Sequence, residues 1–317
     1  MELIVKPTGR CNFACNFCLS GKMASNIKHT EHVSQKLKDL IATLKPNCII
    51  VNGGDPLLSG PAYFQELLDA SDASTEIAIV TNLKDFWISP GKWTSLLRNP
   101  RISVTTSFQY GTGRKWDNST VYDETMFRKM CSLFKSHIGY VPMFIAVITK
   151  ENESRALDHL LLAKELGTTC KLNPVLPLGI SSEAYPKYKM IDIWLEAKKG
   201  GLDKYMNADI QFFNGGCSFN TGLMCASTIR VFWEDTDDVV HYSACDNCST
   251  LGDAIPVDAQ RPIPKKMRLD SKTFINGDKC LSCKLCRFCN ACKAMRESNK
   301  NDPNYCAEMK RREEAIL

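Results

Sequence analysis

The 317-residue sequence predicts an α/β fold in which a parallel sheet is followed by a small cysteine-rich domain. Over the first two hundred residues, short apolar runs rich in Ile and Val alternate with segments of helical spacing, a pattern typical of a parallel sheet with helices outside it. Ten of the sixteen cysteines fall between Cys217 and Cys306, a density that suits a metal- or disulfide-stapled module. We therefore expect two domains, at residues 1–215 and 216–317.

Six short apolar segments are the predicted strands of the sheet. They span residues 3–5, 48–51, 77–81, 102–106, 143–148 and 170–175. Five segments between them have helical spacing, at residues 33–44, 62–70, 93–97, 125–134 and 155–166. This periodicity fits both an open doubly wound sheet and a partial barrel. In either arrangement the carboxyl ends of the strands carry the ligand site.

A cysteine loop follows the first predicted strand directly. Cys11, Cys15 and Cys18 form a C-x3-C-x2-C run among loop-type residues. A [4Fe–4S] cluster normally has four thiolate ligands, so three would leave one iron open to a ligand that is not protein. A structural zinc site would need a fourth Cys or His nearby, and His29 and His32 lie beyond a stretch predicted as loop. The run therefore favours an iron–sulfur cluster over zinc and over three buried structural thiols.

A second motif, Gly53-Gly54-Asp55-Pro56, follows the second predicted strand. Glycines allow the backbone to approach a ligand closely, although a Gly-Gly pair alone is typical of a structural turn. Carboxyl ends of parallel strands share one edge of a sheet, so we expect this motif beside the cysteine loop.

The segment from Cys11 to Cys18, with the aromatic Phe17 before the last cysteine, resembles the signature of the radical S-adenosylmethionine (SAM) enzymes. The resemblance implies a partial (β/α)6 barrel whose open iron binds SAM. Reductive cleavage of SAM would give a 5′-deoxyadenosyl radical that abstracts a substrate hydrogen. The residues from Gly53 to Pro56 resemble the family's Gly-Gly-Glu-Pro motif, which contacts the SAM amino group, although Asp55 replaces the Glu.

Two further residues resemble SAM-binding positions of this family. Ser107 matches the serine of a Ser-x-Asp run after the fourth strand, where Gln109 replaces the acid, and Arg114 resembles an arginine near the SAM carboxylate. The alternative for Arg114 is a solvated loop cation. Asn152 has two interpretations, a polar SAM contact or the N-cap of the next helix, and its position favours the cap.

The cysteine-rich tail has repeated C-x2-C steps, a spacing shared by iron–sulfur and zinc sites. In a reducing compartment, abundant cysteine indicates metal rather than disulfides. The tail resembles the SPASM extension of radical SAM enzymes, which implies two auxiliary [4Fe–4S] clusters. The implied ligands are Cys217, Cys225, Cys245 and Cys292 for the first cluster, and Cys280, Cys283, Cys289 and Cys306 for the second.

Several cysteines are left over from these sets. Cys248 and Cys286 are not among the implied ligands, and either could replace a neighbouring ligand. Separately, the x2 spacing from Cys289 to Cys292 departs from the x3 spacing usual in the family. The remaining three are predicted to be small hydrophobic residues without chemistry: Cys48, Cys131 and Cys170.

Asp246 is the candidate catalytic acid or base of the tail. The chain resembles anaerobic sulfatase-maturating enzymes at the motif level, and there an aspartate after the matching cysteine is thought to take a proton from the substrate. The alternative is a turn residue that bonds its own backbone.

The resemblance implies hydrogen abstraction from a peptide or protein side chain, followed by oxidation, crosslinking, epimerisation or rearrangement. It also implies a flavodoxin- or ferredoxin-type electron donor. Only ten residues precede Cys11, so we expect recognition of the substrate by the barrel mouth, the tail or a separate protein rather than by an N-terminal leader-binding domain. A small-molecule or nucleotide substrate remains an alternative.

Other classes of protein are disfavoured by composition and pattern. An electron carrier without turnover would close each cluster with four cysteines. The net charge of +5, from 40 basic and 35 acidic residues, neither demands nor excludes an acidic partner. A nucleic-acid modifier would need a concentrated basic surface, whereas the clearest basic clusters of the tail, at residues 265–268 and 310–312, resemble solvated faces. No apolar run approaches the length of a membrane helix, and the N-terminus lacks a secretory signal, which favours the cytoplasm.

Overall fold

The computed structural model describes residues 2–18, 30–176, 180–207, 229–234, 241–242, 255–256, 274–289, 296 and 299–316. Its centre is a seven-stranded sheet with the order β6-β5-β4-β3-β2-β1-β7, in which every neighbouring pair is parallel. The strands are β1 (Glu2–Lys6), β2 (Cys48–Val51), β3 (Glu76–Val80), β4 (Ile102–Ser107), β5 (Met143–Ile148), β6 (Cys170–Pro174) and β7 (Ile229–Trp233).

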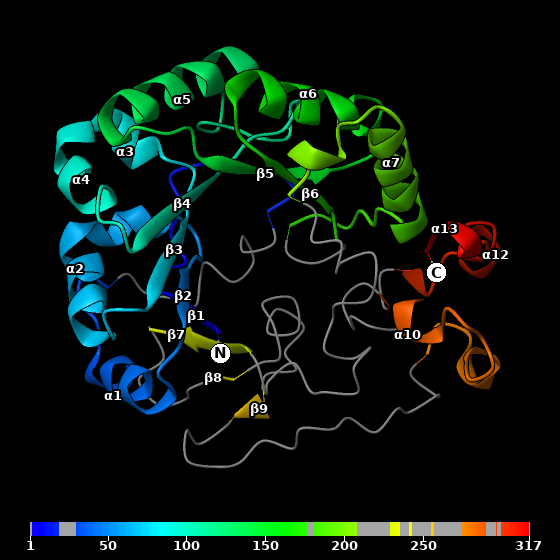
Figure 1. Ribbon diagram of the computed structural model, residues 1–317, viewed down its shortest axis with the longest axis horizontal. Coiled ribbons are helices and arrows are strands. Elements are labelled where there is room, and N and C mark those ends of the chain that lie inside the picture. The colour runs from blue at the N-terminus through cyan, green and yellow to red at the C-terminus, as the bar shows by residue number, and fades with distance from the viewer. Residues whose placement is uncertain are drawn as a thin grey trace.

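All six predicted strands are present, and the predicted α/β partial barrel is confirmed. Within the described residues β6 and β7 do not pair, so the sheet curves without closing (Figure 1). The seventh strand was not predicted, because the sequence around it was interpreted through its cysteines. β7 comes from the segment assigned to the cysteine-rich domain and pairs with β1 along its whole length.

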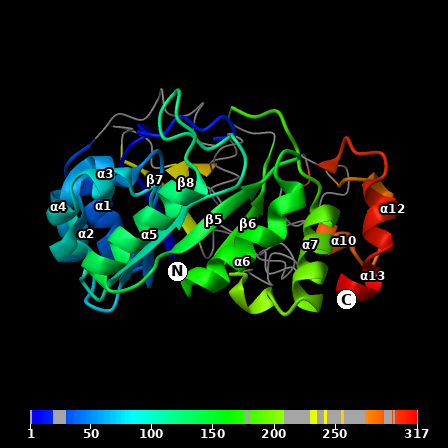
Figure 2. The same ribbon diagram turned by 90° about the horizontal axis from the view of Figure 1, so that it is seen from above.

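The helices lie along the outer, convex side of the sheet, as Figures 1 and 2 show. They are α1 (Gln35–Leu44), α2 (Gly60–Ala70), α3 (Lys84–Ile88), α4 (Pro90–Leu97), α5 (Glu124–Ile138), α6 (Ala156–Leu166) and α7 (Lys187–Lys199). Local sequence explains their ends. The side chains of Ser34 and Asp123 accept hydrogen bonds from the first turns of α1 and α5, and α6 stops at the predicted Gly167, with φ of 69°.

Strand residues alternate between two environments because successive side chains point to opposite faces. In β2 and β3, Ile49, Val51, Ile77 and Ile79 are fully buried against the helices, whereas the residues between them are half-buried on the concave face. The same alternation continues in β4, β5 and β6. The hydrophobic core therefore lies between sheet and helices and leaves the concave face for other contacts.

The described C-terminal segments lie in two places. The helix α12 (Tyr305–Lys310) packs beside α7, near α10 (Cys286–Cys289) and α13 (Glu313–Ile316), whereas the short antiparallel strands β8 (His241–Tyr242) and β9 (Ile255–Pro256) pair with each other beside β7 (Figure 1). Arg312 donates two hydrogen bonds of 2.6 Å to the carboxylate of Asp192 on α7, and so ties the tail to the barrel. No helix in the described part of the chain is long and apolar enough to cross a bilayer.

Three cysteines lie within strand or helix settings, as predicted. Cys131 and Cys170 are buried in the core, whereas Cys48 is half-buried on the concave face. Burial raises the pKa of Cys131 to about 12 and that of Cys48 to about 11, so their thiols stay protonated near neutral pH.

Candidate active site

The cysteine loop is held against the segment that follows β4. The backbone amide of Ala14 donates to the carbonyl of Lys115, and that of Asn16 donates to the carbonyl of Gly113, each over 3.1 Å. A Cβ added to Gly113 would lie 2.7 Å from Asn16 Oδ1 and 3.1 Å from the Phe17 ring. Gly113 therefore allows the two loops to approach closely.

The glycine motif packs against the backbone that leads into the cysteine loop. A Cβ on Gly54 would lie 1.9 Å from the carbonyl oxygen of Arg10, and one on Gly53, with φ of 133°, would lie 2.5 Å from that of Thr8. Hydrogen bonds join the same segments, from Gly54 N to Thr8 O and from Asp55 N to Arg10 O. The predicted juxtaposition of the two motifs is confirmed, and the glycines are required by backbone packing.

Asp55 is a buried anchor of this motif. Its carboxylate accepts hydrogen bonds from the amide of Leu57, from the hydroxyl of Thr81 and from the amide of Asn82. Asn82 in turn donates to Asn12 Oδ1 over 2.8 Å and to Cys11 Sγ over 3.6 Å. Burial raises the pKa of Asp55 to about 6. The contacts link the end of β3 to the cysteine loop.

The structure brings together Arg114, Ser107 and Phe17, which sequence analysis treated separately. Arg114 donates through Nη1 to Ser107 Oγ over 2.9 Å and through Nη2 to Gln109 Oε1 over 3.5 Å. Its guanidinium lies 5.1 Å from the centre of the Phe17 ring, a cation–π distance. Arg114 is only 7% exposed, so the alternative of a solvated loop cation is wrong.

This guanidinium lacks an anionic partner. Its Nε atom is buried without a hydrogen bond, and no carboxylate of the described residues lies within ion-pair distance of it. Burying an unpaired charge is costly. The arrangement is suited to a bound anion such as a carboxylate.

The loop that carries Arg114 is held by residues of the β5–α6 connection and of α6 itself. Asn152 Nδ2 donates to the carbonyls of Tyr110 and Val147, and His159 Nε2 accepts from the amide of Tyr110 over 3.1 Å. Glu151 accepts from the amide and hydroxyl of Thr112 over 2.7 and 2.9 Å. Asn152 is the N-cap residue of the 3-10 turn Glu153–Arg155, in line with the predicted cap, but its side chain makes no capping hydrogen bond. No spacing in the sequence revealed these contacts.

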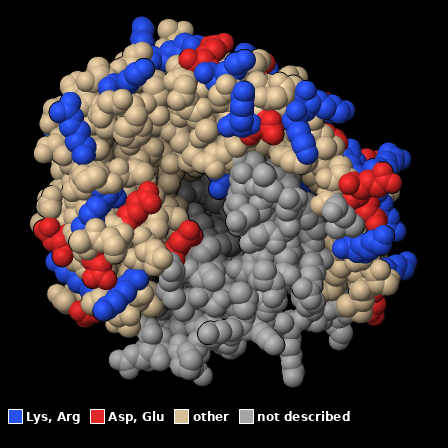
Figure 3. All heavy atoms as spheres, in the orientation of Figure 1, with Lys and Arg blue, Asp and Glu red and all other residues tan. Residues whose placement is uncertain are grey.

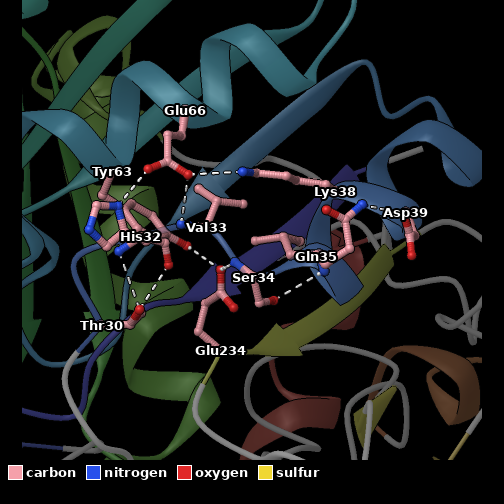
Figure 4. Close-up of polar contacts among 11 residues, drawn as sticks. Thr30, His32, Val33, Ser34, Gln35, Lys38, Asp39, Tyr63, Glu66 and Glu234 are labelled. Carbon is pink, nitrogen blue, oxygen red and sulfur yellow. Dashed lines mark hydrogen bonds and ion pairs between the residues drawn. The ribbon is translucent and has the colours of Figure 1, made fainter.

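A second polar cluster fixes the chain between the cysteine loop and α1 (Figure 4). Glu66 on α2 contacts His32 Nδ1 over 2.7 Å, accepts from the amide of Val33 over 3.2 Å, and pairs with Lys38 over 3.0 Å. These hydrogen bonds, that of His32 above all, lower the pKa of Glu66 to about 2. Glu234, directly after β7, accepts from the amide of Ser34 and from the hydroxyl of Tyr63, as Figure 4 shows.

The three loop cysteines fit a metal cluster by donor chemistry and access. Cys11 is exposed, and Cys15 and Cys18 are half-buried. Although part of Cys11 is accessible to solvent, the protein packed around its thiol desolvates it. This desolvation, the charge of Asp55 and the neighbouring thiols of Cys15 and Cys18 raise the pKa of Cys11 to about 12, so cluster binding would have to displace protons. Among the described residues, no three Cys, His, Asp or Glu side chains already stand in metal-ligand geometry.

A second group of thiols lines a cavity of about 150 Å³ in the tail. The cavity contains all four cysteines of the second implied cluster, Cys280, Cys283, Cys289 and Cys306, together with the spare Cys286. Burial raises the pKa of Cys289 to about 12 and also raises that of Cys306. These five thiols share one cavity, although they do not stand in metal-ligand geometry in this structure.

The remaining candidate residues lie outside the described residues. They are Asp246 and the cysteines implied for the first auxiliary cluster, Cys217, Cys225, Cys245 and Cys292, together with the spare Cys248. Their assignments stay predictions.

Several solved structures share the fold of this chain. One is native anSMEcpe with bound AdoMet and Cp18Cys peptide, with a TM-score of 0.66, 19% identity, and 98% of this chain and 94% of that chain covered. Another is Streptococcus suis SuiB bound to S-adenosylmethionine, with a TM-score of 0.60 and 15% identity over 94% of this chain and 73% of that chain. SuiB bound to the precursor peptide SuiA matches with a TM-score of 0.62 at 15% identity, over 94% of this chain and 72% of that chain.

At these identities the likeness shows the fold, which is the one implied by the sequence resemblance. No family model and no curated protein sequence matches the chain.

Proposed function

We propose that this chain is a radical SAM enzyme that abstracts a hydrogen atom from a peptide or protein side chain. The observation that carries the proposal is the three-cysteine loop held directly against the loop of Arg114, a buried cation without an anionic partner in the described structure. Cluster ligands and a carboxylate receptor therefore stand side by side. SAM offers both a metal-chelating group and a carboxylate.

Each residue of the site has a defined task in this proposal. Cys11, Cys15 and Cys18 would hold a [4Fe–4S] cluster, which when bound supplies the electron for reductive cleavage of SAM. Arg114 binds the SAM carboxylate, and Ser107 orients the guanidinium through the 2.9 Å hydrogen bond. The backbone from Gly53 to Pro56, with Phe17, borders the SAM site.

The tail would hold two auxiliary [4Fe–4S] clusters. The cavity lined by Cys280, Cys283, Cys289 and Cys306 supports the second of them. The first would use Cys217, Cys225, Cys245 and Cys292, and Asp246 beside it would accept a proton from the substrate. Auxiliary clusters suit an oxidative modification, because they can accept the electron left on the substrate. A flavodoxin- or ferredoxin-type protein would reduce the cluster that binds SAM.

A peptide substrate is supported by the solved structures that share the fold. anSMEcpe was solved with a Cp18Cys peptide and SuiB with its precursor peptide SuiA. Fold alone does not fix a substrate, so the peptide assignment is part of the proposal. The modification that follows hydrogen abstraction would be an oxidation, crosslink, epimerisation or rearrangement.

Binding of SAM to the reconstituted, oxidised protein tests the role of Arg114. Losing a charge-assisted hydrogen bond costs about 1.5–3 kcal/mol, so Arg114→Met should weaken SAM binding roughly 10- to 150-fold in equilibrium dialysis. Arg128→Met is a matched control, because Arg128 lies on α5 and, among the described residues, its ion pairs are with Glu124 and Glu165. Equal SAM affinity in the wild type and Arg114→Met would contradict the assignment.

A further inference from the structure

The concave face of β6 carries two polar side chains, Lys171 and Asn173, that have no hydrogen-bonding or ion-pair partner within the described ranges of the chain. Cys170, Leu172 and Pro174 are buried on the helix side of the strand, so Lys171 and Asn173 project from the opposite, concave side and are half-buried there. In the described part of the chain, neither the Lys171 ammonium nor the Asn173 amide makes a side-chain hydrogen bond or ion pair. Lys189 on nearby α7, in contrast, pairs with Glu153 over 2.7 Å.

The strand register places both residues beside the proposed SAM site. Ser107 is aligned with Ile145 on β5, and Ile145 with Lys171 on β6. Neighbouring strands lie about 4.8 Å apart, so the Cα atoms of Ser107 and Lys171 are separated by about 10 Å. In the next row, Val147 donates its amide to Gln109 Oε1 and is aligned with Asn173.

On the concave face, the space between the proposed SAM site on the β4 side and the pair Lys171 and Asn173 on β6 is lined by apolar side chains. Ile145 and Val147 are the β5 residues of the same concave face. Figure 3 shows a hollow at the centre of this side of the molecule, and Figure 1 shows β5 and β6 facing inward, with α6 and α7 on their outer side. An ammonium beside apolar walls attracts an anion more strongly than it would in water.

We propose that Lys171 and Asn173 form a substrate subsite that binds a carboxylate of the peptide. The ammonium would pair with the carboxylate, and the Asn173 amide would donate a second hydrogen bond to it. An extended chain spans about 3.3–3.6 Å per residue, so the distance of about 10 Å between the Cα atoms of Ser107 and Lys171 corresponds to two or three residues of an extended substrate. The inference rests on the proposed function and adds a substrate class to it, a peptide with an acidic side chain or a free C-terminus near the reacting residue.

Affinity selection from synthetic peptide pools tests the subsite. The reconstituted, SAM-loaded wild-type protein is offered three pools of N-acetylated random peptides: amidated peptides that contain Asp and Glu, peptides without acids that end in a free carboxylate, and amidated peptides without acids. Retained peptides are identified by mass spectrometry. We expect about tenfold or greater retention of one carboxylate-containing pool over the neutral pool, equivalent to one charge-assisted contact. Retention of the first pool assigns the side-chain carboxylate, and retention of the second assigns the C-terminus.

Variants connect this preference to the strand. Lys171→Met should lose the preference, Lys171→Arg should keep most of it, and Lys164→Met, on the exposed side of α6, should behave as the wild type. Iron content and the thermal unfolding midpoint report whether Lys171→Met is folded. Equal retention of all pools by the wild type, or an unchanged preference in folded Lys171→Met, would overturn the subsite.

Failure of the subsite and failure of the proposed function have different signatures. Release of 5′-deoxyadenosine by the reduced wild type and by Lys164→Met, with no carboxylate preference, would refute only the subsite. Absence of this release from the wild type would refute the proposed function, whatever the pools show.

Discussion

Replacing His159 by Gln should remove a pH dependence of folding that the structure assigns to this one side chain. His159 is fully buried, its Nε2 accepts the amide of Tyr110 over 3.1 Å, and its Nδ1 faces the carbonyl of Ala156 over 3.2 Å. The neutral ring therefore carries its proton on Nδ1. Burial lowers the pKa of His159 from 6.5 to about 4, because a proton on Nε2 would be desolvated and would face another N–H group.

The direction and size of the effect follow from this shift. The unfolded chain binds the proton near its ordinary pKa while the folded chain resists it down to about pH 4, so stability is complete above about pH 6.5 and is lost as the pH falls toward 4. The pKa shift of His159 contributes at most about 3 kcal/mol to the free energy of unfolding. About 2 kcal/mol of this contribution should be lost between about pH 7 and pH 5.

Urea unfolding of the reconstituted protein under anaerobic conditions, followed by tryptophan fluorescence, measures this loss. Gln can replace one acceptor and one donor of the ring but does not titrate, so His159→Gln should lose about 2 kcal/mol less than the wild type over the same pH interval. Other titrating groups, including any cluster ligands, are common to both proteins and cancel in the difference. Parallel pH profiles of the two proteins would refute the assignment of a buried neutral His159.

Two further substitutions test the cysteine sites. Gly54→Ala would place a Cβ 1.9 Å from a backbone oxygen and should displace the cysteine loop, so that the bound iron falls by about a third. The control Gly91→Ala, whose Cβ would meet nothing within 4 Å, should keep all of the iron. Equal iron content in the two variants would contradict the packing argument. In the tail, Cys283→Ala should lose about a third of the iron and Cys286→Ala none, and the reverse order would assign Cys286 as the ligand.

Much of the fold was predictable because it depends on local patterns. Alternating apolar strands and helices indicated the parallel sheet, and the order of the two motifs placed the cysteine loop beside Gly53 and Gly54. β7 was not predicted, because its five residues lie in a segment dominated by cysteines and because its pairing with β1 joins positions more than two hundred residues apart. Such long-range pairing has no local signal in a single sequence.

The candidate site was predicted as separate residues rather than as an assembly. Ser107 and Arg114 were identified through family-like motifs, but their hydrogen bond depends on a loop bent back by Asn152 and His159. Gln109, which departs from the family pattern, contacts both Arg114 and the backbone of β5. These roles arise from tertiary contacts, so residue type and spacing could not reveal them.

The release of 5′-deoxyadenosine from SAM by the reconstituted, dithionite-reduced protein tests the central claim most directly. The wild type should release it, and a variant with Cys11, Cys15 and Cys18 all changed to Ala should release none above the cluster-free control, while it keeps about two thirds of the iron. Release by the triple variant at the wild-type rate, or no release by a wild-type protein that carries its full iron, would contradict the claim that this loop is the site of radical generation.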